Sequence, residues 1–320
     1  MRTKACDILG IAHPLALAPM GGSTDAALVA AVSGAGGLGM LGATWIDTPM
    51  IGAEIAAIRQ RSNAAFAMSF VLPFADPQAI RLCLDAQVPV MSTFRGDPAP
   101  LIAEARARGI RTIHQATSLA EIEAVVAAGV DVIIAQGNEA GGHGGPEPLW
   151  SFLPDAIQAA GAVPVLAAGG IVDGRGLAAV LALGASGAVM GTRFLASVEA
   201  PVSQVWKQAI LAARPGDTLW STVWDQVHNE DWPGVQVRAL KNAGLMRWHG
   251  RPEALQTQHA EAQAALEAAK SREDADEMDL MAGVGASRIS EILPAAKIVE
   301  QVMAEARDIL SRLGRHAEAG

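Results

Sequence analysis

Short apolar runs alternate, as far as residue 194, with stretches in which apolar positions recur every three or four residues. Short apolar runs bounded by glycine or proline are typical of buried strands, and the longer spacing is typical of helices that face a core. The predicted strands begin near Pro14, Leu38, Ala64, Val88, Arg111, Val130, Val163 and Gly187. The predicted helices between them span residues 25–33, 49–60, 77–86, 100–108, 119–128 and 174–183.

Successive strand starts lie 19 to 33 residues apart, which is the room that a strand, a helix and two loops require. Strands joined through helices pair in parallel. A closed (β/α)8 barrel and an open doubly wound sheet both satisfy this pattern, and the even spacing and the count of eight favour the barrel. The predicted fold class is therefore α/β, a (β/α)8 barrel with an appended, mostly helical segment.

The repeat stops after Phe194, and this divides the chain into three predicted parts. Residues 1–199 would form the barrel with strands one to eight. Residues 200–285 carry five of the seven tryptophans and are expected to form a helical cap or insertion. Residues 286–320 include an amphipathic pattern from 295 to 313, which predicts a C-terminal helix that returns to the barrel and covers strand eight.

Composition narrows the classes of partner. The 33 acidic and 24 basic residues give a net charge of −9 without a basic cluster, which argues against nucleic acid and against an anionic membrane surface. No apolar run approaches the roughly 18–20 residues that span a bilayer, and the N-terminus has no signal-peptide pattern. Cys6 and Cys83 are far apart and lack metal-ligand spacing. We therefore expect a cytoplasmic protein with free thiols.

The segment 135–145, AQGNEAGGHGG, is the strongest candidate for chemistry, and it lies in the longest connection between predicted strands. Glycine side chains bury nothing, and each glycine costs roughly 0.5–1 kcal/mol more in backbone ordering than alanine. Such a loop is expected where something approaches the backbone closely. His143 in this loop is suited to proton transfer near neutral pH. No second His or Cys stands at metal-ligand spacing, so no metal is predicted.

Two glycine-bearing strand ends predict a phosphate site. Residues 163–174 and 187–194 each contain a predicted strand that runs into glycine, and the two strands are neighbours. Loops after strands seven and eight of such barrels often bind phosphate. The backbone N–H groups of Gly170, Gly191 and Thr192 are the expected donors. Alternatively the glycines only close tight turns, but two such loops on adjacent strands favour phosphate.

Other strand ends predict the site of a flat ring. Strand one ends in Pro19-Met20-Gly21, which would let a ring lie against the backbone, and Gln115 and Gln136 could bond a polar heterocycle. The match of residues 34–39 to G-x-G-x-x-G is rejected, because a helix precedes it and a strand follows. The sequence has no G-x-S-x-G motif, which forms the nucleophile elbow of serine hydrolases.

Taken together, the segments 18–21, 35–39, 136–145, 168–176 and 190–194 resemble the nitronate monooxygenases, formerly called 2-nitropropane dioxygenases. The resemblance implies a TIM barrel that binds FMN non-covalently, with His143 as the catalytic residue, a nitronate or nitroalkane as substrate and O2 as co-substrate. The resemblance is compatible with a homodimer. The cofactor-binding residues that it implies are Pro19, Met20, Gly21, Ser69, Gln115, Gln136, Gly141, Gly142, Gly169, Gly170, Met190, Gly191 and Thr192.

Several positions depart from the family pattern. Ser69 stands where the family usually has asparagine, the segment 91–96 lacks a histidine found in some members, and the chain has no tyrosine for a substrate pocket.

Three functions follow as hypotheses. The first is oxidation of alkyl nitronates by O2 to carbonyl compounds and nitrite. The second is an NAD(P)H-dependent flavin reductase on the same barrel, acting on quinones or resembling the enoyl-acyl-carrier-protein reductases. Those reductases typically follow a similar loop with two threonines, where this chain has the segment 146–149. The third is a nucleotide barrel without flavin, which would need a loop cysteine; Cys83 is instead predicted on a helix.

Overall fold

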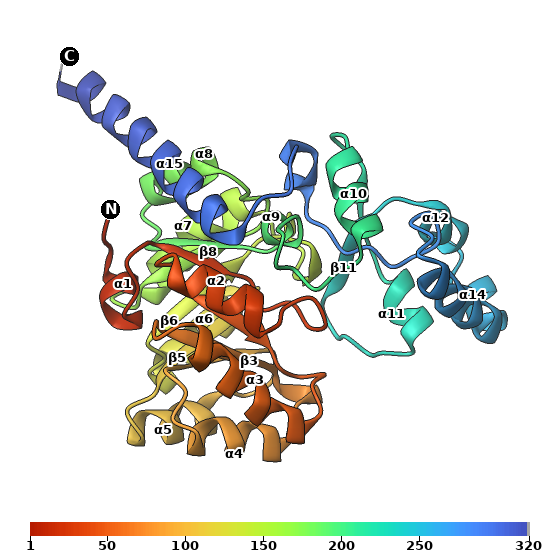
Figure 1. Cartoon of the computed structure of the whole chain (residues 1–320), viewed down its shortest axis with the longest axis horizontal. Coiled ribbons are helices and arrows are strands. Elements are labelled where there is room, and N and C mark those ends of the chain that lie inside the picture. The colour runs from red at the N-terminus through yellow and green to blue at the C-terminus, as the bar shows by residue number, and fades with distance from the viewer. Residues whose placement is uncertain (319–320) are drawn as a thin grey trace.

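Eight parallel strands form a nearly closed barrel in the computed structural model, which describes residues 1–318 (Figure 1). The strands are β1 (Leu15–Leu17), β2 (Gly39–Gly42), β3 (Phe66–Val71), β4 (Val90–Phe94), β5 (Arg111–Ala116), β6 (Val132–Gln136), β8 (Val165–Ala168) and β9 (Gly187–Met190). Their order around the sheet is β1-β9-β8-β6-β5-β4-β3-β2. The remaining seam is bridged where Leu17 N–H donates to Leu38 O at 2.9 Å and Leu38 N–H to Leu15 O at 3.0 Å. The predicted barrel is confirmed, and the open sheet is wrong.

Helices surround this barrel close to the predicted positions. They are α2 (Ala26–Gly34), α3 (Thr48–Arg61), α4 (Pro77–Asp85), α5 (Ala99–Ala107), α6 (Leu119–Ala128), α7 (Leu149–Ala160) and α8 (Gly174–Ala182). Side-chain caps fix several starts: Asp25, Ser118 and Asp173 each accept a hydrogen bond from a backbone N–H three residues later. α1 (Lys4–Leu9) closes the amino-terminal end of the barrel, where Cys6 packs with residues of the barrel interior.

Strand alternation divides the apolar side chains between two cores. On β3, Ala67 belongs to the core inside the barrel, whereas Met68 packs in the layer between strands and helices. On β9, Val189 faces inward and Met190 outward in the same way. Both faces of each strand are therefore covered, which explains why the strands are apolar at nearly every position.

A buried histidine in this barrel makes the stability sensitive to acid. His114 on β5 is 2% exposed, its Nδ1 lies 2.8 Å from Thr93 Oγ1, and burial lowers its pKa to about 4. Below pH 6.5 the unfolded chain binds a proton that the folded protein does not bind until about pH 4. We expect the free energy of unfolding to fall by about 3 kcal/mol over this window through this residue. Urea unfolding of wild type and His114→Gln from pH 7 to 4 tests this, and equal pH dependence of the two proteins would contradict it.

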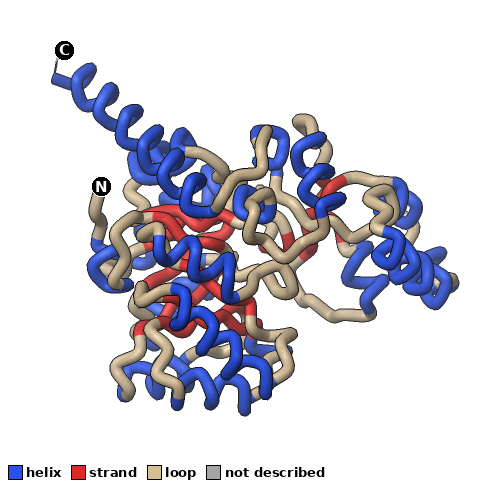
Figure 2. The backbone as a smooth tube through the Cα atoms, viewed as in Figure 1, coloured by secondary structure: helices blue, strands red, loops and turns tan. Residues whose placement is uncertain are grey.

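Residues after the barrel form a lobe beside its carboxyl-terminal mouth (Figure 1). Its helices are α10 (Gln204–Ala212), α11 (Val223–His228), α12 (Ala243–Trp248), α13 (Pro252–Thr257), α14 (His259–Arg272) and the 3-10 turn η2 (Val284–Arg288). It also contains two strands that the sequence analysis did not anticipate, β10 (Thr218–Ser221) and β11 (Gln236–Leu240). Figure 2 shows these strands apart from those of the barrel.

β10 and β11 join β7 (Gly142–Gly144), a short strand in the loop after β6, in a three-stranded antiparallel sheet. Val237 of β11 pairs directly with His143 of β7. The lobe is therefore hydrogen-bonded to the glycine-rich loop of the barrel.

The last helix, α15 (Ala295–Glu318), returns to the barrel and packs against α8 and α2. Ile298, Val302 and Ala306 on its inner face join the core between strands and helices. Because α9 (Thr192–Leu195) is only four residues long, α15 takes the place of the eighth barrel helix. Within residues 1–318, no helix has the length and apolarity to cross a membrane.

Candidate functional site

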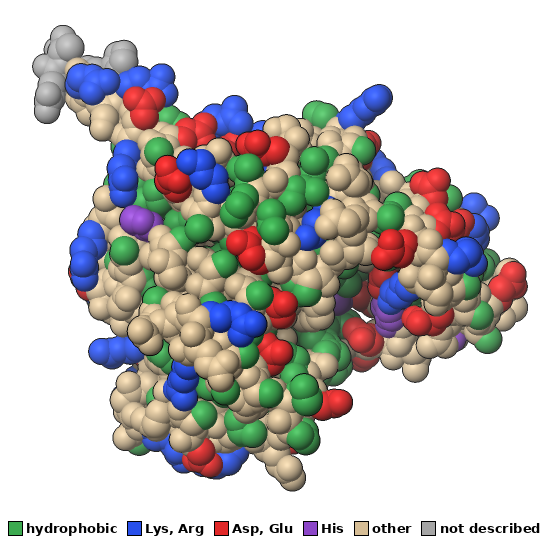
Figure 3. All heavy atoms as spheres, viewed as in Figure 1, with side chains coloured by type: hydrophobic (Ala, Val, Ile, Leu, Met, Phe, Trp, Pro, Cys, Tyr) green, Lys and Arg blue, Asp and Glu red, His purple; other side chains and the backbone are tan. Residues whose placement is uncertain are grey.

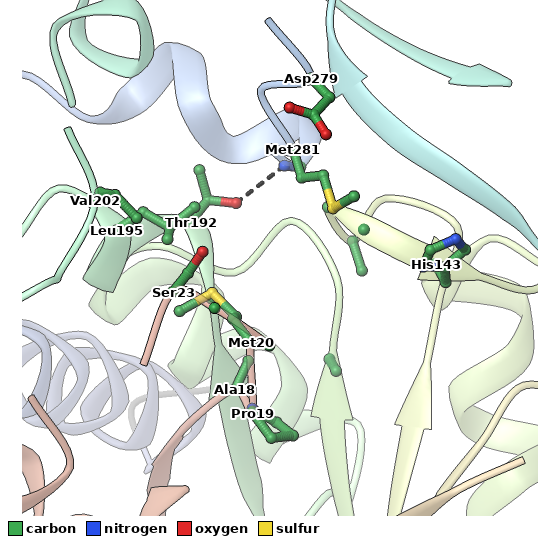
Figure 4. Close-up of a pocket in the computed structure, with 18 of the residues that line it drawn as sticks. Ala18, Pro19, Met20, Ser23, His143, Thr192, Leu195, Val202, Asp279 and Met281 are labelled. Carbon is green, nitrogen blue, oxygen red and sulfur yellow. Dashed lines mark hydrogen bonds between the residues drawn. The ribbon is translucent and has the colours of Figure 1, made fainter. Parts of the chain in front are cut away.

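A cavity of about 560 Å³ lies between the carboxyl-terminal mouth of the barrel and the lobe. In the space-filling view the surface is hollowed there, with histidine and acidic side chains at the edge (Figure 3). Most of the predicted site residues line it: Pro19, Met20, Gly21, Gln115, Gln136, Gly141, Gly142, His143, Gly169, Gly170, Gly191 and Thr192. Figure 4 shows Met20, Thr192 and His143 on different sides of this space.

Two predicted cofactor-binding residues, Met190 and Ser69, lie outside the cavity wall. Met190 is fully buried in the layer between the barrel and its helices, because alternation along β9 turns its side chain outward. Ser69 is on the inward face of β3 two residues before Val71, which does line the cavity, so it lies one layer deeper in the barrel. Neither side chain lines the cavity, and contact of Ser69 and Met190 with the cofactor stays a prediction.

The ends of β8 and β9 offer backbone donors to an anion. Gly169 and Gly170 have φ of 126° and 66°, which favour glycine. Within residues 1–318, the N–H groups of Gly170 and Gly191 donate no hydrogen bond, although both residues line the cavity. Arg288 donates to Gly170 O at 2.6 Å and holds this turn in place. Unused amides at a cavity wall fit a phosphate group.

Thr192 links this end of the cavity to Gly283, which directly precedes η2 of the lobe. Its Oγ1 accepts a hydrogen bond from Gly283 N–H at 2.9 Å, drawn as the dashed line in Figure 4. The hydroxyl proton remains available to an acceptor in the cavity. Gly191 has little room for a side chain, because a Cβ there would lie 3.3 Å from Ala18 Cβ and Met20 Sδ.

The turn after β1 is covered by a ring of the protein itself. A Cβ on Gly21 would lie 2.5 Å from the Trp45 ring, so this glycine accommodates tryptophan. Pro19 and Met20 remain on the cavity wall, and Met20 is drawn there in Figure 4. A flat ligand was predicted against Pro19, Met20 and Gly21, and all three residues line the cavity.

Gln115 and Gln136 form a relay of hydrogen bonds towards the glycine-rich loop. Gln115 Nε2 donates to Gln136 Oε1 at 2.9 Å, and Gln136 Nε2 donates to the carbonyl oxygen of His143 at 3.0 Å. Gln136 therefore positions the backbone of β7, in addition to facing the cavity.

His143 is held by two residues of the lobe. Its Nε2 lies 2.7 Å from Asp225 Oδ1 on α11, and its ring stacks on Trp232 with centroids 3.7 Å apart and planes 12° apart. The side chains of His143 and Asp225 are 14% and 8% exposed. A carboxylate can only accept, so Nε2 carries the proton. Nδ1, which bonds to no residue in 1–318, is then the basic nitrogen available to a ligand in the cavity.

Most glycines of the loop 137–145 are required by contacts within the chain. A Cβ on Gly141 would lie 2.6 Å from backbone atoms of Ala282 and Gly283, and one on Gly145 would lie 2.7 Å from Thr117. The glycine-rich sequence predicted a close approach of another group to this backbone. In the structure the neighbours at these two positions are other segments of the protein, which hold the loop in place.

A second imidazole–carboxylate pair lies in the outer cavity wall. His228 Nε2 is 2.7 Å from Asp279 Oδ2, and Lys270 Nζ is 3.2 Å from the same oxygen. The hydrogen bond to Asp279 raises the pKa of His228. None of these residues was predicted from the sequence. Within residues 1–318, no group of three or more His, Cys, Asp or Glu could hold a metal ion.

Asp225 and Trp232 were also not predicted from the sequence. Each lies more than eighty residues from His143, in a segment predicted to be mostly helical. No local motif marks them, because the pairing of β7 with β11 brings them to the imidazole.

Known proteins resemble this chain over its whole length. Residues 2–79 and 60–305 match the family described as nitronate monooxygenase. A probable nitronate monooxygenase of Staphylococcus saprophyticus is 30% identical, over 98% of this chain and 99% of that protein.

Two solved structures superpose on the chain. FabK from Thermotoga maritima has a TM-score of 0.87 at 31% identity and covers 99% of both chains. The nitroalkane oxidase from Streptomyces ansochromogenes has a TM-score of 0.84 at 29% identity and covers 97% of this chain and 100% of that one. The chain belongs to the nitronate monooxygenase family and is a flavin-dependent oxidoreductase.

Proposed function

We propose that this protein is an FMN-dependent nitronate monooxygenase, which oxidises alkyl nitronates with O2 to carbonyl compounds and nitrite. The observation that carries the proposal is the geometry of His143. Its Nε2 is bonded to Asp225 at 2.7 Å, and its Nδ1 is left for a ligand in the cavity. A nitroalkane is a carbon acid, and a positioned neutral imidazole is suited to remove its α-proton.

The cofactor would lie across the mouth of the barrel. The amides of Gly170 and Gly191 and the Thr192 hydroxyl would bind the phosphate, which is one compact set of donors and suits the single phosphate of FMN. The ring would lie near Pro19 and Met20. Other residues proposed to contact the cofactor are Gly21, Gln115, Gln136, Gly141, Gly142 and Gly169. When bound, the flavin accepts electrons from the substrate and passes them on to O2.

The protein side chains would move and hold one proton. Nδ1 of His143 takes the α-proton of a neutral nitroalkane, and Asp225 stabilises the imidazolium that forms. The imidazolium then faces the anionic nitronate and orients it. The stacked Trp232 keeps the ring plane fixed during this transfer. A substrate that arrives as the nitronate needs only the orienting role.

The similarity to FabK supports a second candidate, an NAD(P)H-dependent flavin reductase acting on quinones or on enoyl thioesters. The barrel and the cavity suit both functions. The two differ in the electron donor, which is the nitronate in the first and NADH or NADPH in the second.

The deciding experiment therefore identifies which compound donates electrons to the flavin. We expect the FMN-loaded protein, mixed without oxygen with propane-2-nitronate, to lose flavin absorbance within its turnover time and to release nitrite and acetone when O2 is admitted. NADH and NADPH should bleach the flavin much more slowly in parallel mixtures. Fast bleaching by either nucleotide, with no reaction of the nitronate, would overturn the proposal in favour of the reductase.

A further inference from the structure

Aromatic side chains gather at one side of the cavity, around His143. Trp45, Phe74, Phe94 and Trp232, here called the aromatic wall, account for two of seven tryptophans and two of six phenylalanines. The Trp232 ring lies 4.8 Å from Phe74, 6.3 Å from Trp45 and 6.5 Å from Phe94, measured between centroids. Trp232 also stacks on the imidazole of His143. The aromatic wall is thus continuous with the proposed base.

The aromatic wall is assembled from separate segments. Trp45 follows β2, Phe74 ends the 3-10 turn η1 (Leu72–Phe74) after β3, Phe94 ends β4, and Trp232 comes from the lobe. Three of the four line the cavity, and the Phe74 ring lies beside those of Trp45 and Trp232. Loops after successive barrel strands converge on one apolar surface next to the candidate active site.

Packing alone does not account for this surface. Trp45, which lines the cavity, is 51% exposed although its side chain is large and apolar, whereas Phe94 and Trp232 are 6% and 7% exposed. Trp232 donates from Nε1 to Glu230 Oε2 at 2.8 Å, so its polar edge is satisfied and its faces remain apolar. Val71 adds an aliphatic side chain to the same side of the cavity. An exposed apolar surface beside a reactive group favours a ligand that covers it.

We propose that the aromatic wall binds a flat apolar group of the substrate, so that arylalkyl nitronates are preferred over short alkyl nitronates. This rests on the proposed function. The anionic head would face His143, and an aryl ring two carbons away would lie against Trp45 and Trp232. Aromatic side chains bind such a ring by stacking or edge contacts, and covering the ring removes apolar area from water.

Kinetics of the FMN-loaded enzyme test the preference directly. We expect the nitronate of 1-nitro-2-phenylethane to have a kcat/KM about 10- to 100-fold above that of nitroethane nitronate, the scale for burying one phenyl ring. Trp45→Ala should lower this ratio about 10-fold, and Trp45→Phe should keep most of it. Trp150→Ala, which removes a 64% exposed tryptophan outside the cavity wall, should leave the ratio unchanged. A ratio near one in wild type would overturn the proposal.

A binding measurement separates this inference from the proposed function. A carboxylate is a planar anion like a nitronate, so 3-phenylpropanoate and propanoate are non-reacting probes. Calorimetry on the FMN-loaded enzyme should show 3-phenylpropanoate binding at least about 10-fold more tightly, with the advantage reduced in Trp45→Ala. If nitronates are not turned over but this difference in binding is present, the inference about the aromatic wall holds and the proposed reaction is wrong. Equal binding of the two acids, with nitronate turnover intact, would refute the aromatic wall alone.

Discussion

Replacement of His143 by alanine is expected to lower kcat with a neutral nitroalkane by about 100-fold or more, the usual scale for loss of a general base. Alanine removes the only ring nitrogen that the geometry leaves for the substrate, while the backbone of β7 keeps its bonds to β11 and to Gln136. Bound flavin should therefore be retained, with its absorbance spectrum little changed. A preformed nitronate needs no proton removal, so its turnover should suffer less than that of the nitroalkane.

The control for this variant is another histidine of the lobe. His249 is exposed after α12 and does not line the cavity, so His249→Ala should retain wild-type kinetics. Unchanged nitroalkane turnover in His143→Ala with full flavin content would end the assignment of this residue as the base. Loss of flavin in the same variant would show that its main role is structural.

The Asp225→Asn variant is expected to have the second largest effect, about 10- to 100-fold on kcat for the nitroalkane. The substitution preserves the shape of a side chain that is only 8% exposed. An amide N–H, however, can donate to Nε2, which places the imidazole proton on Nδ1 and removes the lone pair that faces the substrate. It also removes the negative charge that stabilises the imidazolium.

The comparison of two substrate forms shows whether Asp225 acts through the imidazole. The loss should be much smaller with preformed nitronate, because the proton transfer is bypassed. Glu261→Gln makes the same chemical change at an exposed site on α14 and should have no effect. Equal losses with both substrate forms would indicate that Asp225 serves only the folding of the lobe.

The barrel could be predicted from the sequence because the signals that mark its strands and helices are local and recur along the chain. Each strand is a short apolar run, and caps such as Asp25 and Asp173 together with positive-φ glycines mark the helix ends. The observed strands begin within about two residues of the predicted positions. The placement of Gly170 and Gly191 at one mouth of the barrel followed from parallel strands, which all end on the same side.

The rest of the site depends on contacts between distant segments. β10 and β11 are four and five residues long and are separated by a helix, so no hairpin signal marks them. β7, the partner of β11, lies about ninety residues before it, and its three residues are glycine, histidine and glycine. Asp225 and Trp232 could not be recognised without that pairing. The outward direction of Met190 was accessible from the alternation along its strand.

The antiparallel pairing of Val237 with His143 has a consequence for engineering within this family. The imidazole of His143 sits on a strand whose neighbour belongs to the appended lobe, so barrel and lobe are not interchangeable modules. Grafting a foreign lobe to alter substrate range would have to carry over residues 218–240 with their register, or the His143 side chain would lose its orientation.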